Sequence, residues 1–196
     1  ENASHTLNES LAQQGWLDAN LKVDLIEDTQ TVQIVITGSQ GPLFTLAPAE
    51  FDGEPIKSTA FLNGALQQAD PLLAHGRYTP EALDNALQVL TEYYRSQGYL
   101  NPLLSRGTVE QLRPRWKLFK GSTVPMQAHI HVQPGPQTIL SGFELVGRIE
   151  DVDNEDHFSD LLGKPLNPAE LDARCRKIAQ AYQEAGYLLA DASAST

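Results

Sequence analysis

The sequence SQGYLNPLL (residues 96–104) places a glycine and an aromatic residue directly after an amphipathic stretch. The same glycine-aromatic-leucine triplet recurs, so that Gly15-Trp16-Leu17, Gly98-Tyr99-Leu100 and Gly186-Tyr187-Leu188 lie 83 and 88 residues apart. Glycine is the residue that most readily takes the left-handed backbone conformation found just after a helix C-terminus. The triplets therefore predict three helix ends, and their spacing indicates a repeated folding unit.

The residues upstream of the second and third triplets match at an offset of 88. Thr79-Pro80 aligns with Asn167-Pro168, and apolar residues follow each pair at the spacing of one helix face. Threonine or asparagine suits the N-cap, and proline suits the first helical position because its missing N–H needs no partner there. These patterns predict a helix over 80–97 and an equivalent helix that begins at 168. The matching apolar residues are Leu83, Leu87, Leu90 and Tyr94, and Leu171, Cys175, Ile178 and Tyr182.

A second match, at an offset of 94, relates residues 32–53 to residues 126–147. Apolar and polar residues alternate at the start of both stretches, which is typical of a strand with one buried face. A Gly-Pro pair, Gly41-Pro42 or Gly135-Pro136, then breaks the strand before a new one begins. Two offsets that each have a structural reason indicate a true repeat.

One period of the repeat has the order β-α-α-β-β. In the middle copy we expect helices over about 57–69 and 80–97, and strands over 43–51, from about 100, and over 124–133. Two helices can cover one face of a three-stranded sheet. The predicted fold class is therefore α+β, as tandem modules of which the first and last are incomplete, and we expect the chain to be a fragment of a longer one.

The module boundaries follow from the same matches. Residues 1–40 should hold a second helix and the last two strands of one module, and residues 41–134 a complete module. Residues 135–196 should hold a first strand, two helices and the start of a second strand. The middle module carries 11 additional residues before its last strand, since residues 98–136 span 39 positions and residues 15–42 span 28.

The composition is that of an acidic globular protein. The 196 residues are 41% apolar and 20% charged, with a formal net charge of −11. This charge argues against nucleic acid as a partner, because phosphate binding needs a basic surface. The balance is uneven, at −7 for residues 1–53, +2 for 54–136 and −6 for 137–196.

Sequence signals for location are few. The uncharged stretch over residues 29–49 is interrupted by polar residues, glycine and proline, so we expect no membrane-spanning helix. No signal peptide is recognisable, which fits a cytosolic, processed or excised chain. The single cysteine, Cys175, excludes an internal disulfide framework and lies at a core position of its predicted helix.

The additional residues of the middle module contain a basic and aromatic stretch, RPRWKLFK (113–120). It could contact lipid phosphates or an acidic partner. We favour a hairpin whose charges lie in water, because four cations exert little long-range attraction in a chain of net charge −11. The residues of this candidate patch are Arg113, Arg115, Trp116, Lys117 and Lys120.

Other side chains that could bind a metal are better explained as surface residues. His129 and His131 share one strand face, but no third ligand is evident and we expect them to face solvent. The acidic run at 150–157 lacks the glycine and terminal glutamate of an EF-hand loop. No catalytic, nucleotide-binding or zinc signature occurs. We therefore expect no enzymatic activity, no cofactor and no metal.

The three ordered copies resemble a string of polypeptide-transport-associated (POTRA) domains. That resemblance is carried by the three glycine-aromatic pairs, by Gly41-Pro42 and Gly135-Pro136, and by the closing FDG (51–53) and LVG (145–147). Incomplete ends and the 11 additional residues depart from the family pattern. The resemblance implies the periplasmic arm of an outer-membrane barrel assembly or translocation protein, of the BamA or TamA type or a two-partner-secretion transporter.

The resemblance further implies binding without chemistry, on the periplasmic side of the outer membrane of a Gram-negative bacterium. Unfolded outer-membrane or secreted polypeptides, or periplasmic accessory proteins, would add a strand to an exposed sheet edge. Contact with the membrane would come only through a C-terminal β-barrel outside this chain. The family's strand order places the binding edges at Leu21, Val23 and Leu25 and at Leu100, Leu103 and Leu104.

Two alternatives stay open at this point. A POTRA-bearing envelope or cell-division protein would recruit one fixed partner, although such proteins usually carry a single module. An uncharacterised α+β enzyme or small-ligand domain would instead show a deep pocket with convergent polar groups.

Overall fold

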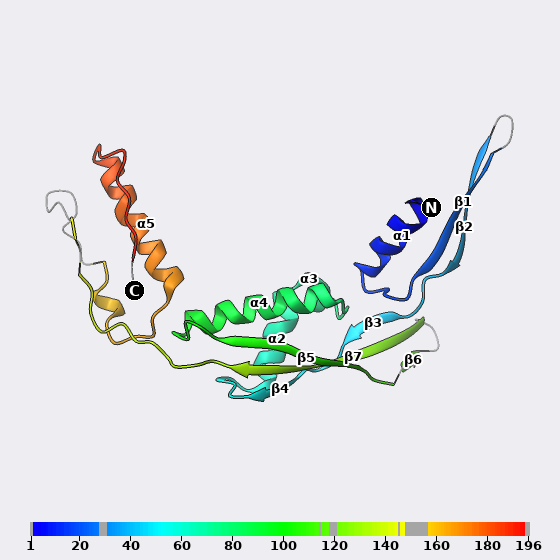
Figure 1. The fold of residues 1–196 in the computed structure, drawn as a ribbon, viewed down its shortest axis with the longest axis horizontal. Coiled ribbons are helices and arrows are strands. Elements are labelled where there is room, and N and C mark those ends of the chain that lie inside the picture. Colours follow the sequence, from blue (N-terminus) through cyan, green and yellow to red (C-terminus); the bar gives the residue numbers. More distant parts are fainter. Residues whose placement is uncertain are drawn as a thin grey trace. The chain divides into compact units, whose positions relative to one another are not determined.

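The structure is a computed structural model that describes residues 2–27, 31–113, 115–117, 121–144, 146–147 and 157–194. The chain forms two compact units. Unit 1 comprises Glu1–Leu90 and Leu104–Gln133, and unit 2 comprises Thr91–Leu103 and Pro134–Thr196. Helices and sheets occur in both the amino-terminal and the central part of the chain (Figure 1), and the predicted α+β class is confirmed. None of the described helices is long and apolar enough to cross a membrane.

Unit 1 begins with one helix and a hairpin. Helix α1 (Asn2–Ala12) precedes the antiparallel strands β1 (Asn20–Glu27) and β2 (Val32–Ser39). In their register Val23 lies opposite Ile36 and Leu25 opposite Ile34, so the apolar residues of both strands share one face. The alternation seen in the sequence therefore sets the register, as expected when one face of a strand pair is apolar.

The central sheet of unit 1 is built around β7 (Gly121–Gln133). The strands β3 (Leu43–Leu46) and β4 (Glu50–Gly53) pair in parallel with successive parts of β7. The strands β5 (Leu103–Gln111) and β6 (Arg115–Lys117) also pair with β7, and β6 does so in the antiparallel sense. The predicted strand over 43–51 is thus correct in place but divided in two, with Pro48, which has no N–H to donate, in the interruption.

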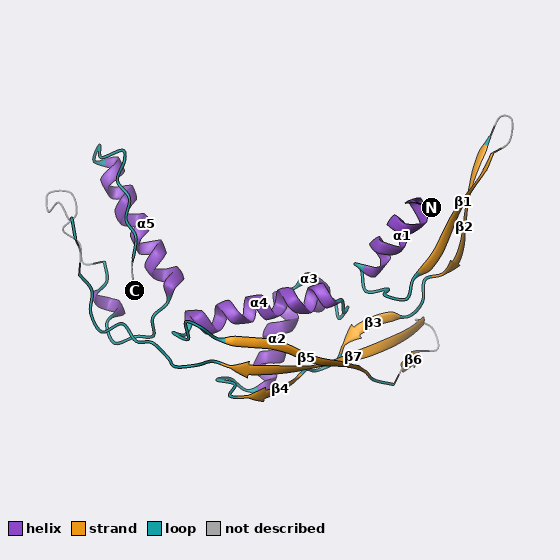
Figure 2. Ribbon diagram, in the orientation of Figure 1, coloured by secondary structure: helices purple, strands orange, loops and turns teal. Residues whose placement is uncertain are grey.

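Three helices accompany this sheet: α2 (Thr59–Ala69), α3 (Pro71–Ala74) and α4 (Pro80–Ser96). Figure 2 shows α4 running alongside β5 and β7. The side chains of Ser58, Asp70 and Thr79 accept hydrogen bonds from amides at the starts of these helices, as N-caps do. Side chains from the helix and strand layers form the core, where Leu62, Leu66, Leu83, Ala128, Ile130 and Val132 are fully buried.

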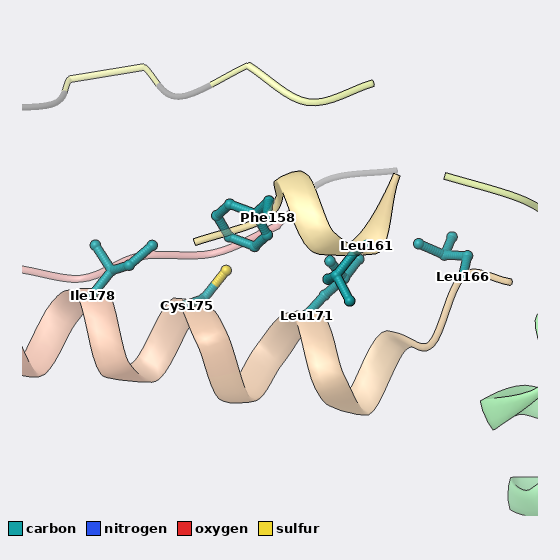
Figure 3. Close-up of a cluster of buried hydrophobic side chains, with 6 residues drawn as sticks. All are labelled: Phe158, Leu161, Leu166, Leu171, Cys175 and Ile178. Carbon is teal, nitrogen blue, oxygen red and sulfur yellow. The ribbon is translucent and has the colours of Figure 1, made fainter. Parts of the chain in front are cut away.

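Unit 2 is organised around α5 (Pro168–Glu184), preceded by the 3-10 helix η1 (Ser159–Leu161). Asn167 caps α5 through a hydrogen bond from the Glu170 amide to its side chain, as the sequence predicts. Figure 3 shows Phe158 facing the side of α5 that carries Cys175. The buried cluster comprises Phe158, Leu161, Leu166, Leu171, Cys175 and Ile178.

The three Gly-aromatic pairs have one geometry. Gly15, Gly98 and Gly186 have positive φ angles of 93°, 87° and 100°. The amide of the aromatic residue that follows each glycine donates to the carbonyl five residues earlier, at 3.0, 3.2 and 3.0 Å. This is the Schellman motif that ends a helix. In two copies the residue whose carbonyl accepts this hydrogen bond is itself a tyrosine, and the two rings lie close together. The ring centroids of Tyr94 and Tyr99 are 6.2 Å apart, and those of Tyr182 and Tyr187 are 6.0 Å apart.

A hydrogen-bonded junction repeats as well. The Phe44 amide donates to the Gly15 carbonyl at 2.9 Å, and the Tyr78 amide donates to the Phe44 carbonyl at 2.9 Å. In unit 2 the Thr138 amide donates to the Gly98 carbonyl at 2.8 Å, and the Leu166 amide donates to the Thr138 carbonyl at 2.9 Å. The same backbone connections thus recur between equivalent positions of the repeat.

The organisation differs from the simple module plan in detail. Helix α3 was not predicted. The sequence also predicts two helices within residues 135–196, but the described residues before α5 form only the three-residue η1. Leu100 lies in a bend before β5 and packs against the buried cluster of unit 2. The division into residues 1–40, 41–134 and 135–196 stays a prediction.

Candidate polypeptide-binding surfaces

The edges of the sheets are the surfaces at which strand addition could occur. An edge strand presents unpaired N–H and C=O groups that template pairing with another chain. In the part of the chain that the structure describes, the edges belong to β1 and β2 in the hairpin and to β3, β4, β5 and β6 in the central sheet. These edges differ in how far other side chains already occupy them.

The predicted edge of β1 is largely occupied by α1. The Asn8 side chain donates to the Leu21 carbonyl at 2.9 Å and accepts from the Leu21 amide at 2.8 Å. Ser4 Oγ accepts from the Val23 amide at 2.8 Å. Strand addition at Leu21 and Val23 would have to displace these side chains, so the structure disfavours this part of the predicted site. Leu25 lies farther along β1 and is exposed.

The outer edge at β3 and β4 is held in a similar way. The Asn63 side chain in α2 accepts from the Ala49 amide at 2.7 Å and donates to the Ala49 carbonyl at 3.0 Å. Ala49 lies in the interruption between the two strands. One asparagine thus reproduces the pair of hydrogen bonds that a neighbouring strand would make. We call Asn8 and Asn63 the asparagine clamps.

The outer edge of β5 carries no such clamp among the described residues. This nine-residue strand pairs with β7, and no second strand among the described residues pairs with it. Leu103 is 55% exposed at its start and Leu104 is half-buried. The structure places both predicted residues on β5, whereas Leu100 lies outside the strand because it packs in unit 2.

A charged pair connects β5 to α4. Arg106 of β5 lies 3.2 Å from Asp84 of α4 and also contacts the Pro80 carbonyl at 3.5 Å. Burial raises the pKa of the nearby Tyr78 hydroxyl, the positive charge of Arg106 opposes that rise, and Asp84 adds to it. Sequence reasoning did not identify Arg106, because the pairing depends on a helix residue 22 positions away.

The hairpin of β1 and β2 carries an exposed row of apolar side chains, which the sequence did not identify as a candidate binding surface. Val32, Ile34 and Ile36 of β2 are 64%, 64% and 56% exposed. Their alternation predicts a strand with one buried face, but the described structure leaves that face open. An exposed apolar strand of this kind is a candidate contact surface.

The candidate basic patch is only partly described. Arg113 is exposed. The strand β6 consists of Arg115, Trp116 and Lys117, and Lys120 lies outside the described residues. β6 pairs antiparallel with the start of β7, which agrees with the predicted hairpin. An interaction of this patch with anions stays a prediction.

The two histidines of β7 are engaged by carboxylates of β4. His129 Nδ1 lies 3.3 Å from Glu50, and His131 Nδ1 lies 2.6 Å from Asp52. These are directly opposed cross-strand pairs, and the side chains are partly exposed. Among the described residues no group of three or more potential ligands could hold a metal ion. The acidic run at 150–156 lies outside them.

Unit 2 contains an open apolar groove of about 1050 Å³. It is lined by α5, including Leu171, Cys175 and Ile178, by Phe158, and by residues 140, 142–144, 146–147 and 186–194. Burial raises the pKa of the Cys175 thiol, which keeps it in the unreactive neutral form. The groove lacks the convergent polar groups of an active site, since Glu144 and Asp191 are the charged residues among its described lining.

Comparisons with known proteins complete this description. No family model and no curated protein sequence matches the chain. Among solved structures, the chain is similar to the crystal structure of Haemophilus influenzae BamA POTRA3-5. The TM-score is 0.37 and the identity 13%, over 93% of this chain and 68% of that chain.

Proposed function

We propose that this protein is a tandem POTRA-like scaffold that binds extended polypeptides by adding a strand to the outer edge of β5. The proposal places the chain in the periplasm, as part of an outer-membrane protein assembly or secretion factor. Its clients are unfolded outer-membrane or secreted polypeptides, and the action is binding without catalysis. The motif repeat supports the family, and the distribution of the asparagine clamps supports the site.

The clamps carry the argument for β5. Proteins normally protect sheet edges, because an open edge pairs with other chains. Here Asn8 covers Leu21 of β1 and Asn63 covers Ala49 between β3 and β4, while among the described residues no equivalent clamp covers the outer edge of β5 or of β2. Within the central sheet, an open edge opposite a partly covered one is suited to reversible strand addition.

The surroundings of β5 suit a client of varied sequence. Backbone pairing is nearly independent of sequence, so affinity comes from main-chain hydrogen bonds. The exposed Leu103 offers an apolar contact, and the Arg106 and Asp84 pair offers one cation and one anion beside the strand. Neither charge dominates, which favours neither acidic nor basic clients.

Photo-cross-linking tests the site directly. One variant carries a photoreactive amino acid at position 103. The matched control carries it at position 21, on the edge that Asn8 covers. A urea-unfolded outer-membrane barrel protein is then diluted into each sample. We expect adducts from position 103 and few from position 21. Equal yields from the two positions would contradict the assignment to β5.

A backbone test separates strand addition from nonspecific apolar contact. Leu104→Pro removes one N–H from β5 and should lower adduct formation several-fold. Val23→Pro, whose amide is already bound to Ser4, should leave adducts at position 103 unchanged. If Leu104→Pro perturbs folding, a client peptide with alternate amides methylated gives the same test without altering the protein. Undiminished binding of that peptide would refute strand addition.

A further inference from the structure

Two side chains of α1 are spaced to match the edge of β1. Figure 1 shows α1 lying alongside the hairpin. Ser4 and Asn8 are four residues apart, which is about 6 Å along a helix axis. Leu21 and Val23, whose backbone groups they bind, are about 6.8 Å apart along an extended strand. Because the two intervals nearly agree, α1 meets successive backbone groups of one strand edge.

The groups that α1 binds are those that a third strand would use. Alternate residues of a strand direct their backbone groups to opposite edges. The amides of Leu21 and Val23 are bound by α1 and so face away from β2. The side chain of Asn8 carries an N–H donor and a carbonyl acceptor, as a peptide unit does. At this edge α1 therefore makes hydrogen bonds of the kind that a neighbouring strand makes.

This cover is not a general feature of the repeat. At the offset of 83 residues between the first two glycine-aromatic pairs, Ser4 corresponds to Leu87 and Asn8 to Thr91. A leucine side chain has no hydrogen-bonding group, so the same pair of contacts cannot recur on α4. The corresponding strand in the middle copy is β5, whose outer edge carries no equivalent clamp among the described residues. The fold itself therefore does not require a covered edge at this position.

The carboxyl-terminal end of α1 is fixed independently of β1. Gly15 ends the helix with a φ angle of 93°, and its carbonyl accepts from the Phe44 amide at 2.9 Å. A movement of α1 away from β1 is thus a rotation about Gly15, which moves Ser4 farther than Asn8. Such a rotation breaks the contacts to β1 and keeps the contact to Phe44.

The side chains of β1 indicate which kind of strand could take the place of α1. Leu21 and Val23 lie on one face of the strand, and Lys22 and Asp24 lie on the other. Apolar residues opposite the first pair would form favourable cross-strand contacts. The second pair has one charge of each sign, so it favours neither acidic nor basic segments. A second copy is a poor occupant, because residues 1–53 carry −7 and two such regions repel.

We propose that α1 is a displaceable cover of the β1 edge, and that an extended, alternately apolar polypeptide replaces Ser4 and Asn8 and adds to β1 as a third strand of the hairpin. The added strand binds the backbone groups that α1 releases, so the edge is hydrogen-bonded in both states. The client class is that of the proposed function, but the edge is a different one and does not depend on β5.

Removal of the cover should open the edge to a client. A photoreactive amino acid at position 21 is combined with Ser4→Ala and Asn8→Ala, and a urea-unfolded outer-membrane barrel protein is diluted into the sample. We expect adducts at position 21 to increase at least about tenfold over the protein with Ser4 and Asn8 intact, because side-chain hydrogen bonds no longer compete with the client. Adducts at position 103 should not change.

Control variants separate the cover from general destabilisation. Thr6→Ala changes α1 on its exposed side, and Asn63→Ala removes the clamp of the central sheet. Both should leave adducts at position 21 unchanged. If the double variant does not fold, Asn8→Asp gives the same test, because aspartate has the shape of asparagine but its carboxylate cannot donate to the Leu21 carbonyl. This variant should also increase the adducts, by a smaller factor.

Three outcomes would overturn the proposal. One is an unchanged adduct yield at position 21 although amide exchange at Leu21 accelerates, which shows that the uncovered edge takes no client. Another is an equal increase in Thr6→Ala. The third is cross-linking between two copies of the protein in place of the client, which assigns the edge to self-association. Adducts that appear at position 21 but not at position 103 would support the cover and refute the site proposed on β5.

Discussion

The side chain of Asn8 binds both backbone polar groups of Leu21, donating to its carbonyl at 2.9 Å and accepting from its amide at 2.8 Å. Asn63 does the same to Ala49 at 3.0 and 2.7 Å. Both asparagines lie on helices; Asn8 binds the edge of β1, and Asn63 binds the residue in the interruption between β3 and β4. Each clamp covers the backbone that a further strand would otherwise bind at that position.

Asn8→Ala should open the edge of β1. Loss of two hydrogen bonds at a partly buried site is expected to lower the free energy of unfolding by about 1–2 kcal/mol. Amide hydrogen exchange at Leu21 should accelerate, because its donor loses the Asn8 acceptor. Thr6→Ala on the exposed side of α1 is the control and should leave Leu21 exchange unchanged. Unaltered Leu21 exchange in Asn8→Ala would contradict the clamp.

Gly98→Ala should destabilise the junction in unit 2. The φ angle of Gly98 is 87°, and an added Cβ would lie 2.7 Å from the Thr138 carbonyl oxygen. Strain and steric conflict together should cost about 2–4 kcal/mol in thermal or urea unfolding. Gly64→Ala in α2 has open space around the new methyl group and should be neutral or stabilising by up to about 1 kcal/mol. Equal stability of the two variants would show that Gly98 is not required.

Acidification should loosen the contact between η1 and α5. Arg174 binds Asp160 through two hydrogen bonds of 2.6 and 2.8 Å and lowers the pKa of that carboxyl group. A lowered pKa in the folded state means that the stabilisation is present near neutral pH and is lost as pH falls below about 4.

Asp160→Asn tests this pH dependence, because asparagine cannot titrate. The variant should be less stable than the wild-type protein at pH 7, and the difference should shrink in urea unfolding toward pH 3. A difference that stays constant across this range would exclude Asp160 as its source.

The Cys175 thiol should react slowly in the native protein. It is 6% exposed, and burial raises its pKa, so both access and thiolate formation are limited. We expect the reaction with a disulfide reagent to accelerate by orders of magnitude in denaturing urea. Rapid stoichiometric labelling under native conditions would contradict the packing of Cys175 against α5 neighbours.

Local sequence was sufficient where a residue has one physical role. Gly98 and Gly186 were predicted to end helices, and both have the positive φ that only glycine adopts without strain. Asn167 was predicted as a cap and accepts from the Glu170 amide. Cys175 was predicted in the core and is buried. For the glycines and Asn167 the relevant contact lies within a few residues, and for Cys175 the apolar spacing along one helix was enough to predict burial.

Predictions failed where the partner is distant. Leu100 was assigned to an edge strand, but it packs against the cluster of unit 2. The interruption of the predicted strand over 43–51 has a local cause instead, since Pro48 has no N–H to donate. Arg106 was overlooked, because its pairing with Asp84 becomes visible only when β5 lies beside α4.

The sequence by itself determined the repeat, the helix ends and the α+β class, because these depend on glycine, proline and apolar spacing along a few turns or strands. Only the tertiary structure decided which edges are clamped and which groove is open. Those features arise from side chains of one element meeting the backbone of another, as Asn63 meets Ala49 across 14 residues. No local pattern encodes that meeting, since it depends on where packing places each helix.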